Sequence, residues 1–295
     1  MIEIRNLTKT FGETKAVDNL SLTINPGIVG LVGHNGAGKS TLFRLLSDVF
    51  TPDAGEILIE GKPHNLPETK ARVFFLSDDP YCGLTDNYKD VYRFYANFYP
   101  IDFEKYTGLL DTLHLPKKGR VGNYSKGMKR QLFLALSLSV EADVYLLDEA
   151  FDGIDPLALD LIKGEIIKLG ESGKTVILSS HNIASLERLV DRFILLYKGK
   201  LSKEGTDEDM GESLVKYQGV FQQEVKEEDF AKLGFRIASF KKVGSIYHVV
   251  FAISDKEEPD IQESLKPILW EKVAIDPDEV IALQMRLAEK EAEHE

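Results

Sequence analysis

Short apolar runs rich in β-branched residues alternate with helical patterns of apolar and polar positions from the N-terminus to about residue 200. Such runs predict buried strands, and apolar spacings of three and four predict helices. The predicted strands are Ile28–Val32, Val73–Leu76, Val144–Leu147, Thr175–Ser179 and Phe193–Tyr197, and the predicted helices are Lys39–Ser47, Pro156–Leu169 and Ile183–Val190. This alternation favours a doubly wound α/β domain with a mainly parallel sheet.

Two other segments of this domain have different patterns. The opening residues to about Ile24 and the hairpin Gly55–Pro63 predict an antiparallel β flank. Residues 81–142 contain no convincing strand pattern. The helices predicted there are Asp86–Phe98, Asp102–Leu113 and Ser125–Glu141, so we expect a helical insertion.

The pattern changes again after about residue 205 and predicts a second domain. The predicted strands are Gly219–Val225, Phe235–Val243 and Ile246–Ile253, followed by helices over Asp260–Ile268 and from Asp276 onward. We therefore predict an α/β domain over residues 1–205 and a small α+β domain over residues 206–295.

Net charge supports this division. The chain carries a formal charge of −12. Residues 206–295 contain 21 acidic and 11 basic side chains, so most of the negative charge belongs to the second domain. An acidic chain is a weak candidate for nonspecific nucleic-acid binding, and we predict no nucleic-acid partner.

Cysteine content and hydropathy restrict the cellular compartment and the class of protein that fit the sequence. The single cysteine, Cys82, excludes an intrachain disulfide framework and is typical of a reducing compartment. No apolar run is long enough to cross a membrane, and the N-terminus lacks the layout of a signal peptide. Six scattered histidines do not have the spacing of a structural zinc site.

A glycine-rich segment between the first predicted parallel strand and the following helix matches G-x-x-x-x-G-K-[ST]. Its residues are Gly33, His34, Asn35, Gly36, Ala37, Gly38, Lys39, Ser40 and Thr41. Glycines let backbone N–H groups turn toward phosphate oxygens, and the helix N-terminus adds positive potential. We expect Lys39 to reach the β- and γ-phosphates and the Ser40 hydroxyl to bind Mg²⁺.

Two carboxylates end the apolar strand Val144–Leu147. In an open α/β sheet this places Asp148 and Glu149 beside the phosphate loop. We predict that Asp148 holds Mg²⁺ and that Glu149 polarises a water molecule for attack on the γ-phosphate.

A third segment, Asn123–Leu132 (NYSKGMKRQL), starts a mostly apolar helix. Ser125 is a good N-cap, but Gly127 lies in the first helical turn, where glycine costs roughly 0.5–1 kcal/mol relative to alanine. A residue without a side chain at a capped helix N-terminus allows the backbone to approach a polyanion.

Together these motifs resemble the nucleotide-binding subunit of ABC (ATP-binding cassette) transporters over about residues 1–205. The resemblance implies an ATPase with a P-loop NTPase fold, using ATP and Mg²⁺. It also implies a head-to-tail dimer with a second cassette, as a homodimer or heterodimer, in which Ser125 and Gly127 contact the γ-phosphate bound by the opposite subunit.

Further roles follow from the resemblance alone. Phe11 would stack on adenine, with Val17 beside the same ring, although a lone aromatic residue there can also fill the core. Gly153-Ile154-Asp155 would communicate between the two sites, and Asp155 can equally cap the next helix. His181, after the strand Thr175–Ser179, would sense the γ-phosphate.

The sequence departs from the family pattern at four positions. Asp78 stands where a glutamine usually contacts Mg²⁺ and the membrane subunit, and it is either a third metal-site residue or part of an acidic turn. Lys126 and Met128 replace the usual glycine and glutamine of the signature, and Ala150 replaces a common proline.

One cassette without a membrane segment implies a membrane-spanning permease on a separate chain, docked beside Asp78 and the helices of residues 86–113. We therefore expect a cytoplasmic protein held at the inner face of the cell membrane by that partner. The signature and the loop 77–80 most resemble bacterial exporters of drugs, antimicrobial peptides or lipids. The second domain would serve dimerisation or regulation, or be a passive extension.

Two other classes of ABC protein fit the sequence less well. Non-transport ABC ATPases of the ribosome-associated or chromosome and DNA-repair types usually carry two cassettes or a long coiled coil, and neither pattern is present here. A non-hydrolysing regulatory subunit is disfavoured because the candidate catalytic residues Lys39, Asp148, Glu149 and His181 are all present.

Overall fold

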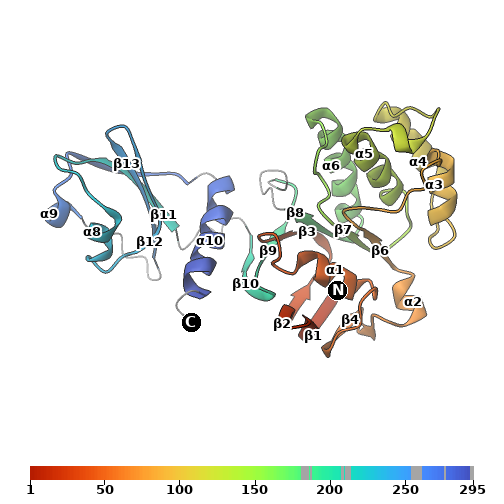
Figure 1. Cartoon of the computed structure of the whole chain (residues 1–295), viewed down its shortest axis with the longest axis horizontal. Coiled ribbons are helices and arrows are strands. Elements are labelled where there is room, and N and C mark those ends of the chain that lie inside the picture. The colour runs from red at the N-terminus through yellow and green to blue at the C-terminus, as the bar shows by residue number, and fades with distance from the viewer. Residues whose placement is uncertain are drawn as a thin grey trace. The chain divides into compact units, whose positions relative to one another are not determined.

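A computed structural model describes residues 1–180, 186, 188–206, 209, 214–253, 261–275 and 277–292 of the chain (Figure 1). The chain divides into two compact units, Met1–Ser202 and Lys203–Glu295. Each unit has its own hydrophobic core.

A six-stranded sheet forms the centre of the first unit, in the order β10-β9-β3-β8-β7-β6. Its strands are β3 (Gly27–Val32), β6 (Val73–Leu76), β7 (Val144–Leu147), β8 (Thr175–Ser180), β9 (Arg192–Tyr197) and β10 (Lys200–Gly205). The neighbours from β9 through β3, β8 and β7 to β6 pair in parallel. Their carboxyl ends therefore meet at one edge of the sheet, where ligands bind in open α/β folds.

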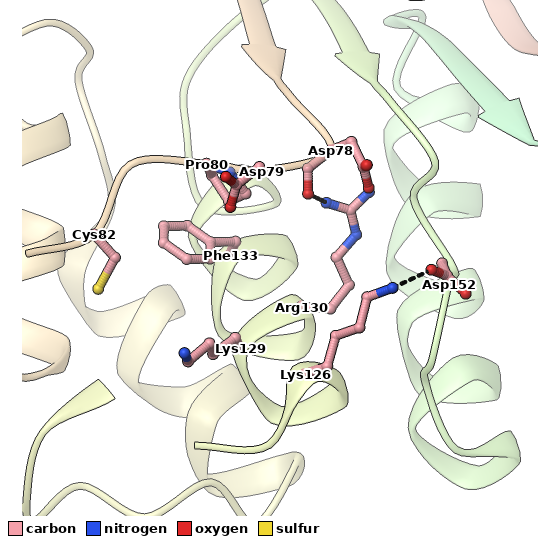
Figure 2. Close-up of a pocket in the computed structure, with 9 residues that line it drawn as sticks. All are labelled: Asp78, Asp79, Pro80, Cys82, Lys126, Lys129, Arg130, Phe133 and Asp152. Atoms are coloured by element: carbon pink, nitrogen blue, oxygen red, sulfur yellow. Dashed lines mark hydrogen bonds and ion pairs between the residues drawn. The ribbon is translucent and has the colours of Figure 1, made fainter. Parts of the chain in front are cut away.

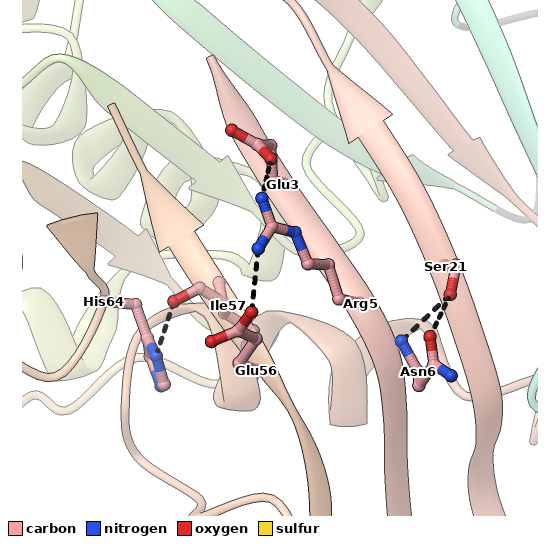
Figure 3. Close-up of polar contacts among 7 residues, drawn as sticks. All are labelled: Glu3, Arg5, Asn6, Ser21, Glu56, Ile57 and His64. Atoms are coloured by element: carbon pink, nitrogen blue, oxygen red, sulfur yellow. Dashed lines mark hydrogen bonds and ion pairs between the residues drawn. The ribbon is translucent and has the colours of Figure 1, made fainter. Parts of the chain in front are cut away.

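An antiparallel sheet lies against this centre, in the order β2-β1-β4-β5. Its strands are β1 (Ile2–Phe11), β2 (Thr14–Ile24), β4 (Ala54–Ile59) and β5 (Lys62–Pro63). Polar contacts join its strands: Arg5 bridges Glu3 and Glu56 at 2.6 and 2.9 Å, and the Ser21 hydroxyl accepts from the Asn6 N–H at 2.9 Å (Figure 3).

Helix α1 (Lys39–Leu46) fills the space between the two sheets. Its residues Leu42, Phe43 and Leu45 are buried in one cluster with residues of β1, β2 and β4 and of the parallel sheet. Helix α6 (Pro156–Glu171) contacts β3 and β8, and it covers the other face of the parallel sheet (Figure 1). The helix that follows the glycine-rich loop is thus fixed on both sides by the core.

The helical insertion contains α3 (Tyr88–Tyr95), α4 (Phe103–Thr112), the short 3₁₀ helix η1 (Val121–Asn123) and α5 (Lys126–Ser137). Each α-helix begins at a side-chain cap: Asn87 for α3, Asp102 for α4 and Ser125 for α5. Such caps satisfy the free N–H groups of the first turn and so fix where each helix starts. A small helix, α2 (Pro67–Lys70), precedes the insertion.

The second unit is an antiparallel sheet with helices. Its strands lie in the order β12-β13-β11-β14. They are β11 (Leu214–Val220), β12 (Arg236–Val243), β13 (Ile246–Ala252) and β14 (Leu269–Val273), and its helices are α8 (Glu227–Ala231), α9 (Gln262–Leu265) and α10 (Pro277–Ala292). Aromatic residues dominate its core, where Tyr217 stacks on Trp270 with 4.9 Å between ring centroids. An ion pair of 2.5 Å between Lys216 and Glu279 joins α10 to the sheet.

The fold class predicted from the sequence is confirmed, with differences at the ends of elements. The predicted helix Asp86–Phe98 begins later, at Tyr88, because Asn87 and Asp90 form a capping box, and it ends at Tyr95. The helix predicted over Asp260–Ile268 is limited to α9, which ends at Lys266 in a left-handed conformation before Pro267. Asp260, Asp276 and half of the helix predicted over Ile183–Val190 lie outside the described residues.

The strand predicted over Gly219–Val225 was placed too late. Strand β11 begins at Leu214 and ends at Val220, where it pairs with Leu269. Lys216 and Gln218 alternate with buried residues along it, so one face of the strand is half-polar, which weakens its apolar signal in the sequence. Strands β10 and β14 and helices α2 and α8 were not predicted.

Candidate functional site

The glycine-rich loop connects β3 to α1 and passes very close to neighbouring backbone. A Cβ atom on Gly33 would lie 2.5 Å from the carbonyl oxygen of Leu196, and one on Gly38 would lie 2.3 Å from that of Ala16. Gly38 also has φ +105°, which L-residues rarely adopt. Packing alone therefore requires glycine at both positions.

The first turn of α1 carries the features of an anion site. No side chain caps this end of the helix, and its first turn contains no acidic residue. The positive end of the helix dipole is therefore not neutralised by the helix's own side chains. Ser40 and Thr41 are half-buried in this turn, whereas His34, Asn35 and Gly36 are exposed and Ala37 is buried.

Lys39 folds back into the loop, and its residue is only 6% exposed. Its Nζ donates to the carbonyl oxygens of Gly33 at 2.6 Å and His34 at 3.3 Å, and it lies 3.8 Å from Glu149 Oε1. Burial lowers the pKa of Lys39, while the carboxylates of Glu149 and Asp148 oppose that shift. Lys39 thus joins the loop to the end of β7.

Asp148 follows β7 and is 1% exposed. The Ser179 hydroxyl donates to Asp148 Oδ1 at 2.5 Å, but Oδ2 is buried without a hydrogen-bond partner among the described residues. A buried carboxylate oxygen without a partner is costly unless a cation or donor completes it. This oxygen, with the Ser40 hydroxyl of the first turn of α1 as a second oxygen ligand, fits the oxygen chemistry of Mg²⁺.

Glu149 has a left-handed backbone, with φ +46°. This conformation costs an L-residue about 1–2 kcal/mol. Two contacts hold it: its N–H donates to Ser179 Oγ at 2.8 Å, and its carbonyl oxygen accepts from Arg130. Ser179 therefore contacts both carboxylate residues, through the side chain of Asp148 and the backbone of Glu149.

The signature segment contacts residues 152–155 of its own chain. Ser125 Oγ accepts from the Met128 N–H at 3.1 Å, as expected for the N-cap of α5. Lys126 Nζ lies 2.5 Å from Asp152 Oδ2. A Cβ on Gly127 would lie 2.3 Å from the Gly153 carbonyl oxygen. Farther along α5, Gln131 donates to Asp155 at 2.8 Å, and Asp155 caps α6.

Sequence reasoning missed Arg130, a third basic residue of the signature segment. Only 5% of it is exposed, and its guanidinium contacts the ends of both β6 and β7. The available signal was its place next to the apolar run 132–136, in a helix that is buried on all sides from Arg130 to Ser137. Figure 2 shows Arg130 pointing toward the backbone at Asp78.

The remaining predicted site residues have distinct surroundings. Phe11 is 45% exposed at the end of β1, with its ring edge against Phe50 at 5.4 Å. Val17 is fully buried in the core. Asp78 lines a pocket of about 230 Å³ with Lys126, Arg130 and others (Figure 2), and Ser40 and Asp148 do not line it. The adenine contacts of Phe11 and Val17 and the metal contact of Asp78 stay predictions. His181 lies outside the described residues.

Comparison with known proteins identifies the family. The model of the ABC transporter family matches residues 17–152. An uncharacterized ABC transporter ATP-binding protein of Methanocaldococcus jannaschii, MJ1023, is 34% identical over 220 residues, which cover 71% of this chain and 79% of that protein. The chain belongs to the ATP-binding proteins of ABC transporters.

Other relatives extend the comparison. The ABC transporter ATP-binding protein YtrB of Bacillus subtilis is 29% identical over 287 residues, covering 95% of this chain and 96% of that protein. The Nod factor export ATP-binding protein I of Rhizobium etli is 33% identical and covers 72% of this chain and 71% of its own length. The similarity to YtrB therefore includes the second unit of this ABC protein.

Solved structures agree with this assignment. The ATP-binding subunit of an ABC transporter superposes with a TM-score of 0.65 at 26% identity, covering 72% of this chain and 92% of that one. A dimeric cassette, MJ0796, with bound ADP and Pi has the same fold, with a TM-score of 0.62 at 24% identity over 70% of this chain and 98% of its own. The chain is thus an ATP-binding ABC ATPase subunit.

Among the described residues, no helix combines the length and hydrophobicity that crossing a bilayer requires.

Proposed function

We propose that this ABC subunit powers export through a separate membrane-spanning partner, by ATP-driven dimerisation of two cassettes. The observation that carries the proposal is the division of the candidate site. Lys39 lies near Asp148 and Glu149 in one chain, whereas Ser125 accepts from the Met128 N–H and Gly127 faces the Gly153 carbonyl oxygen of that same chain. Arg130 of the signature segment donates to the backbone carbonyl oxygens of Asp148 and Glu149, from the side of its own chain. A second copy would supply the missing segment.

In the proposed mechanism the phosphate loop and Lys39 bind the triphosphate of ATP. Ser40 and Asp148 would hold Mg²⁺, whose charge offsets that of the phosphate groups when it is bound. Glu149 accepts a proton from the attacking water, since its carboxylate lies within 3.8 Å of the lysine that would contact the γ-phosphate. Ser125 and the Gly127 N–H of the second cassette close the site.

An exposed aromatic cluster supports docking of a membrane partner. Tyr81, Phe94 and Phe98 are 62%, 39% and 65% exposed. Their rings contact each other, with centroid distances of 4.8 Å for Tyr81–Phe94 and 5.6 Å for Phe94–Phe98. Exposed apolar clusters of this kind mark protein interfaces. A permease bound there would hold the subunit at the inner face of the membrane.

The export direction is supported by the relatives named for Nod factor export. It can be tested with the partner permease and this subunit reconstituted in vesicles, by following which way a candidate substrate moves on addition of ATP outside. ATP-dependent uptake into vesicles whose cassettes face outward is expected for an exporter. Release of preloaded substrate under the same conditions would contradict the proposal.

The ATPase cycle has a separate test. Glu149→Gln should abolish most turnover and let Mg-ATP hold the subunit as a dimer in size-exclusion chromatography. Lys39→Ala should lose most nucleotide affinity, and chelation of Mg²⁺ should stop turnover in the wild type. A Glu149→Gln subunit that stays strictly monomeric with Mg-ATP would contradict dimerisation without contradicting ATP binding.

A further inference from the structure

The guanidinium group of Arg130 donates hydrogen bonds to five backbone carbonyl oxygens. Its Nε donates to Ala150 at 3.0 Å, and Nη1 donates to Ser77 and Asp78, both at 3.1 Å. Its Nη2 donates to the carbonyl oxygens of Asp148 and Glu149. A guanidinium has five N–H donors, so these five carbonyl groups match its full capacity.

These acceptors lie at the ends of two neighbouring strands. Strands β6 and β7 pair in parallel, with Leu76 opposite Leu147. Residues 77–78 and 148–150 therefore leave the sheet side by side. Carbonyl groups at such strand ends have no ladder partner beyond them, and a buried carbonyl group needs a donor. Arg130 supplies that donor to both segments from α5.

The contact between Arg130 and Glu149 involves the residue proposed to accept the proton during ATP hydrolysis. Glu149 has φ +46°, so its backbone must be held against its intrinsic preference. Ser179 binds its N–H and Arg130 binds its carbonyl oxygen, which fixes both peptide groups that flank its Cα. The orientation of these two peptide planes sets the direction of the Cα–Cβ bond, from which the side chain carries the carboxylate.

We propose that Arg130 is a positioning residue for ATP hydrolysis, which aims the Glu149 carboxylate and ties it to the signature helix and to the loop 77–78. The proposal rests on the proposed role of Glu149 as the group that accepts the proton. Arg130 itself touches neither nucleotide nor water in this scheme. A displacement of the signature helix would reach the Glu149 backbone through the Arg130 side chain.

A purely structural role would have a different consequence. If Arg130 served only to satisfy buried carbonyl groups, its loss would reduce the folded fraction and leave the kcat of the folded protein unchanged. A positioning role predicts a lower kcat at an unchanged KM for ATP, because nucleotide binding depends on the phosphate loop and not on the direction of Glu149. Misplacement of a catalytic group by about 1 Å can cost about 100-fold in rate.

The experiment compares Arg130→Ala, Arg130→Lys and the control Lys129→Ala in the full chain. Lys129 is the neighbouring cation on α5 and lines the same pocket. We expect Arg130→Ala to lower kcat about 100-fold with nucleotide affinity within about threefold of wild type, and Lys129→Ala to change neither. Each variant is checked for folding by circular dichroism and for binding with a fluorescent ATP analogue.

Chemical rescue separates positioning from stability. The pocket beside Arg130 opens to solvent, so millimolar guanidinium chloride can replace the missing group in Arg130→Ala. We expect guanidinium to raise the kcat of this variant at least tenfold and to leave wild type, Glu149→Gln and the nucleotide affinity unchanged. Methylammonium chloride, which cannot reach both strand ends at once, should not rescue.

Two results would overturn the proposal. One is a folded Arg130→Ala subunit with wild-type kcat. The other result applies if Arg130→Ala does not fold, and it is a wild-type kcat in Arg130→Lys. This variant keeps the positive charge but cannot donate to five carbonyl groups. Wild-type turnover in Glu149→Gln would instead contradict the proposed function, since the group to be positioned would be unnecessary.

Discussion

The carbonyl oxygen of Gly153 occupies the place where any side chain on Gly127 would begin. An ideal Cβ on Gly127 would lie 2.3 Å from that oxygen. The glycine of the signature segment is therefore required by packing within one chain, before any contact with a second subunit is considered. The same residue can serve both purposes, since the absence of a side chain brings the backbone of α5 close to its neighbours on either side.

This contact predicts the outcome of Gly127→Ala. The new methyl group must push apart backbone at residues 127 and 153, and such overpacking costs about 1–3 kcal/mol of unfolding free energy. Gly108→Ala in α4 is the matched control, because a Cβ there meets nothing within 4 Å. Gly108→Ala should raise the free energy of unfolding by about 0.5–1 kcal/mol, because alanine has a higher helix propensity than glycine. Urea denaturation measures both, and equal effects would disprove the steric account.

Lys126 provides a second prediction. Its side chain is 77% exposed and pairs with Asp152 of the same chain, and this contact raises the pKa of Lys126. Exposed ion pairs contribute little, so Lys126→Gly should change the ATP affinity of the isolated subunit by less than about fivefold. Titration with a fluorescent nucleotide, repeated with Asp152→Ala and the double variant, measures the coupling. A loss of affinity that persists in the Asp152→Ala background would show that Lys126 acts on ATP directly.

Ser179 provides a third prediction. Replacement by alanine would leave Asp148 Oδ1 and the Glu149 N–H without their buried partner, at a cost of about 1–3 kcal/mol. ATP turnover should fall more than nucleotide affinity, because both carboxylate residues lose a contact. Ser137→Ala removes an equally buried hydroxyl whose bond is to Phe133 of its own helix, and it should cost less. Similar losses of turnover in both variants would contradict the special role of Ser179.

His64 predicts a dependence of stability on pH. Burial lowers the pKa of His64, although Asp48, 3.6 Å from Nε2 and paired with Lys70, partly opposes this. Its Nδ1 faces the Ile57 carbonyl oxygen (Figure 3). The folded state therefore prefers neutral histidine, so stability from this group is present above the unfolded pKa of about 6.5 and falls as pH decreases through it.

The measurement is urea denaturation between pH 7.5 and 5.5, in steps, on wild type and His64→Asn. One proton changes the free energy of unfolding by at most about 1.4 kcal/mol per pH unit. The slope of unfolding free energy against pH should therefore be smaller in His64→Asn by up to that amount. His114→Asn, which removes an exposed histidine, is the control and should keep the wild-type slope. An unchanged slope in His64→Asn would contradict the prediction.

Much of the first unit could be predicted because its signals are local. Strand β7 is four buried apolar residues followed by Asp148, and the glycine spacing of residues 33–38 is fixed by contacts within the loop and its neighbours. Caps such as Ser125 and Asp155 also act on residues two or three positions away. Strands and helix starts of this kind can be inferred without knowledge of the tertiary structure.

The rest depends on contacts between distant residues. Lys126 and Arg130 look alike in sequence as cations of one segment, yet the first is exposed and the second is buried on five carbonyl groups. Strand β14 was missed because Trp270 and Leu269 become a strand only by pairing with Gly219 and Val220, about 50 residues earlier. Burial and pairing of this kind are set by the whole fold, not by local pattern.

The left-handed backbone of Glu149 implies that activity and stability oppose each other at this position. Only glycine adopts φ +46° without a steric penalty, so the substitution least demanding for the backbone is Glu149→Gly, which removes the carboxylate. Selection for thermal stability alone would favour a residue that cannot catalyse. A thermostable variant of this subunit obtained without a screen for turnover should therefore be sequenced first at residue 149.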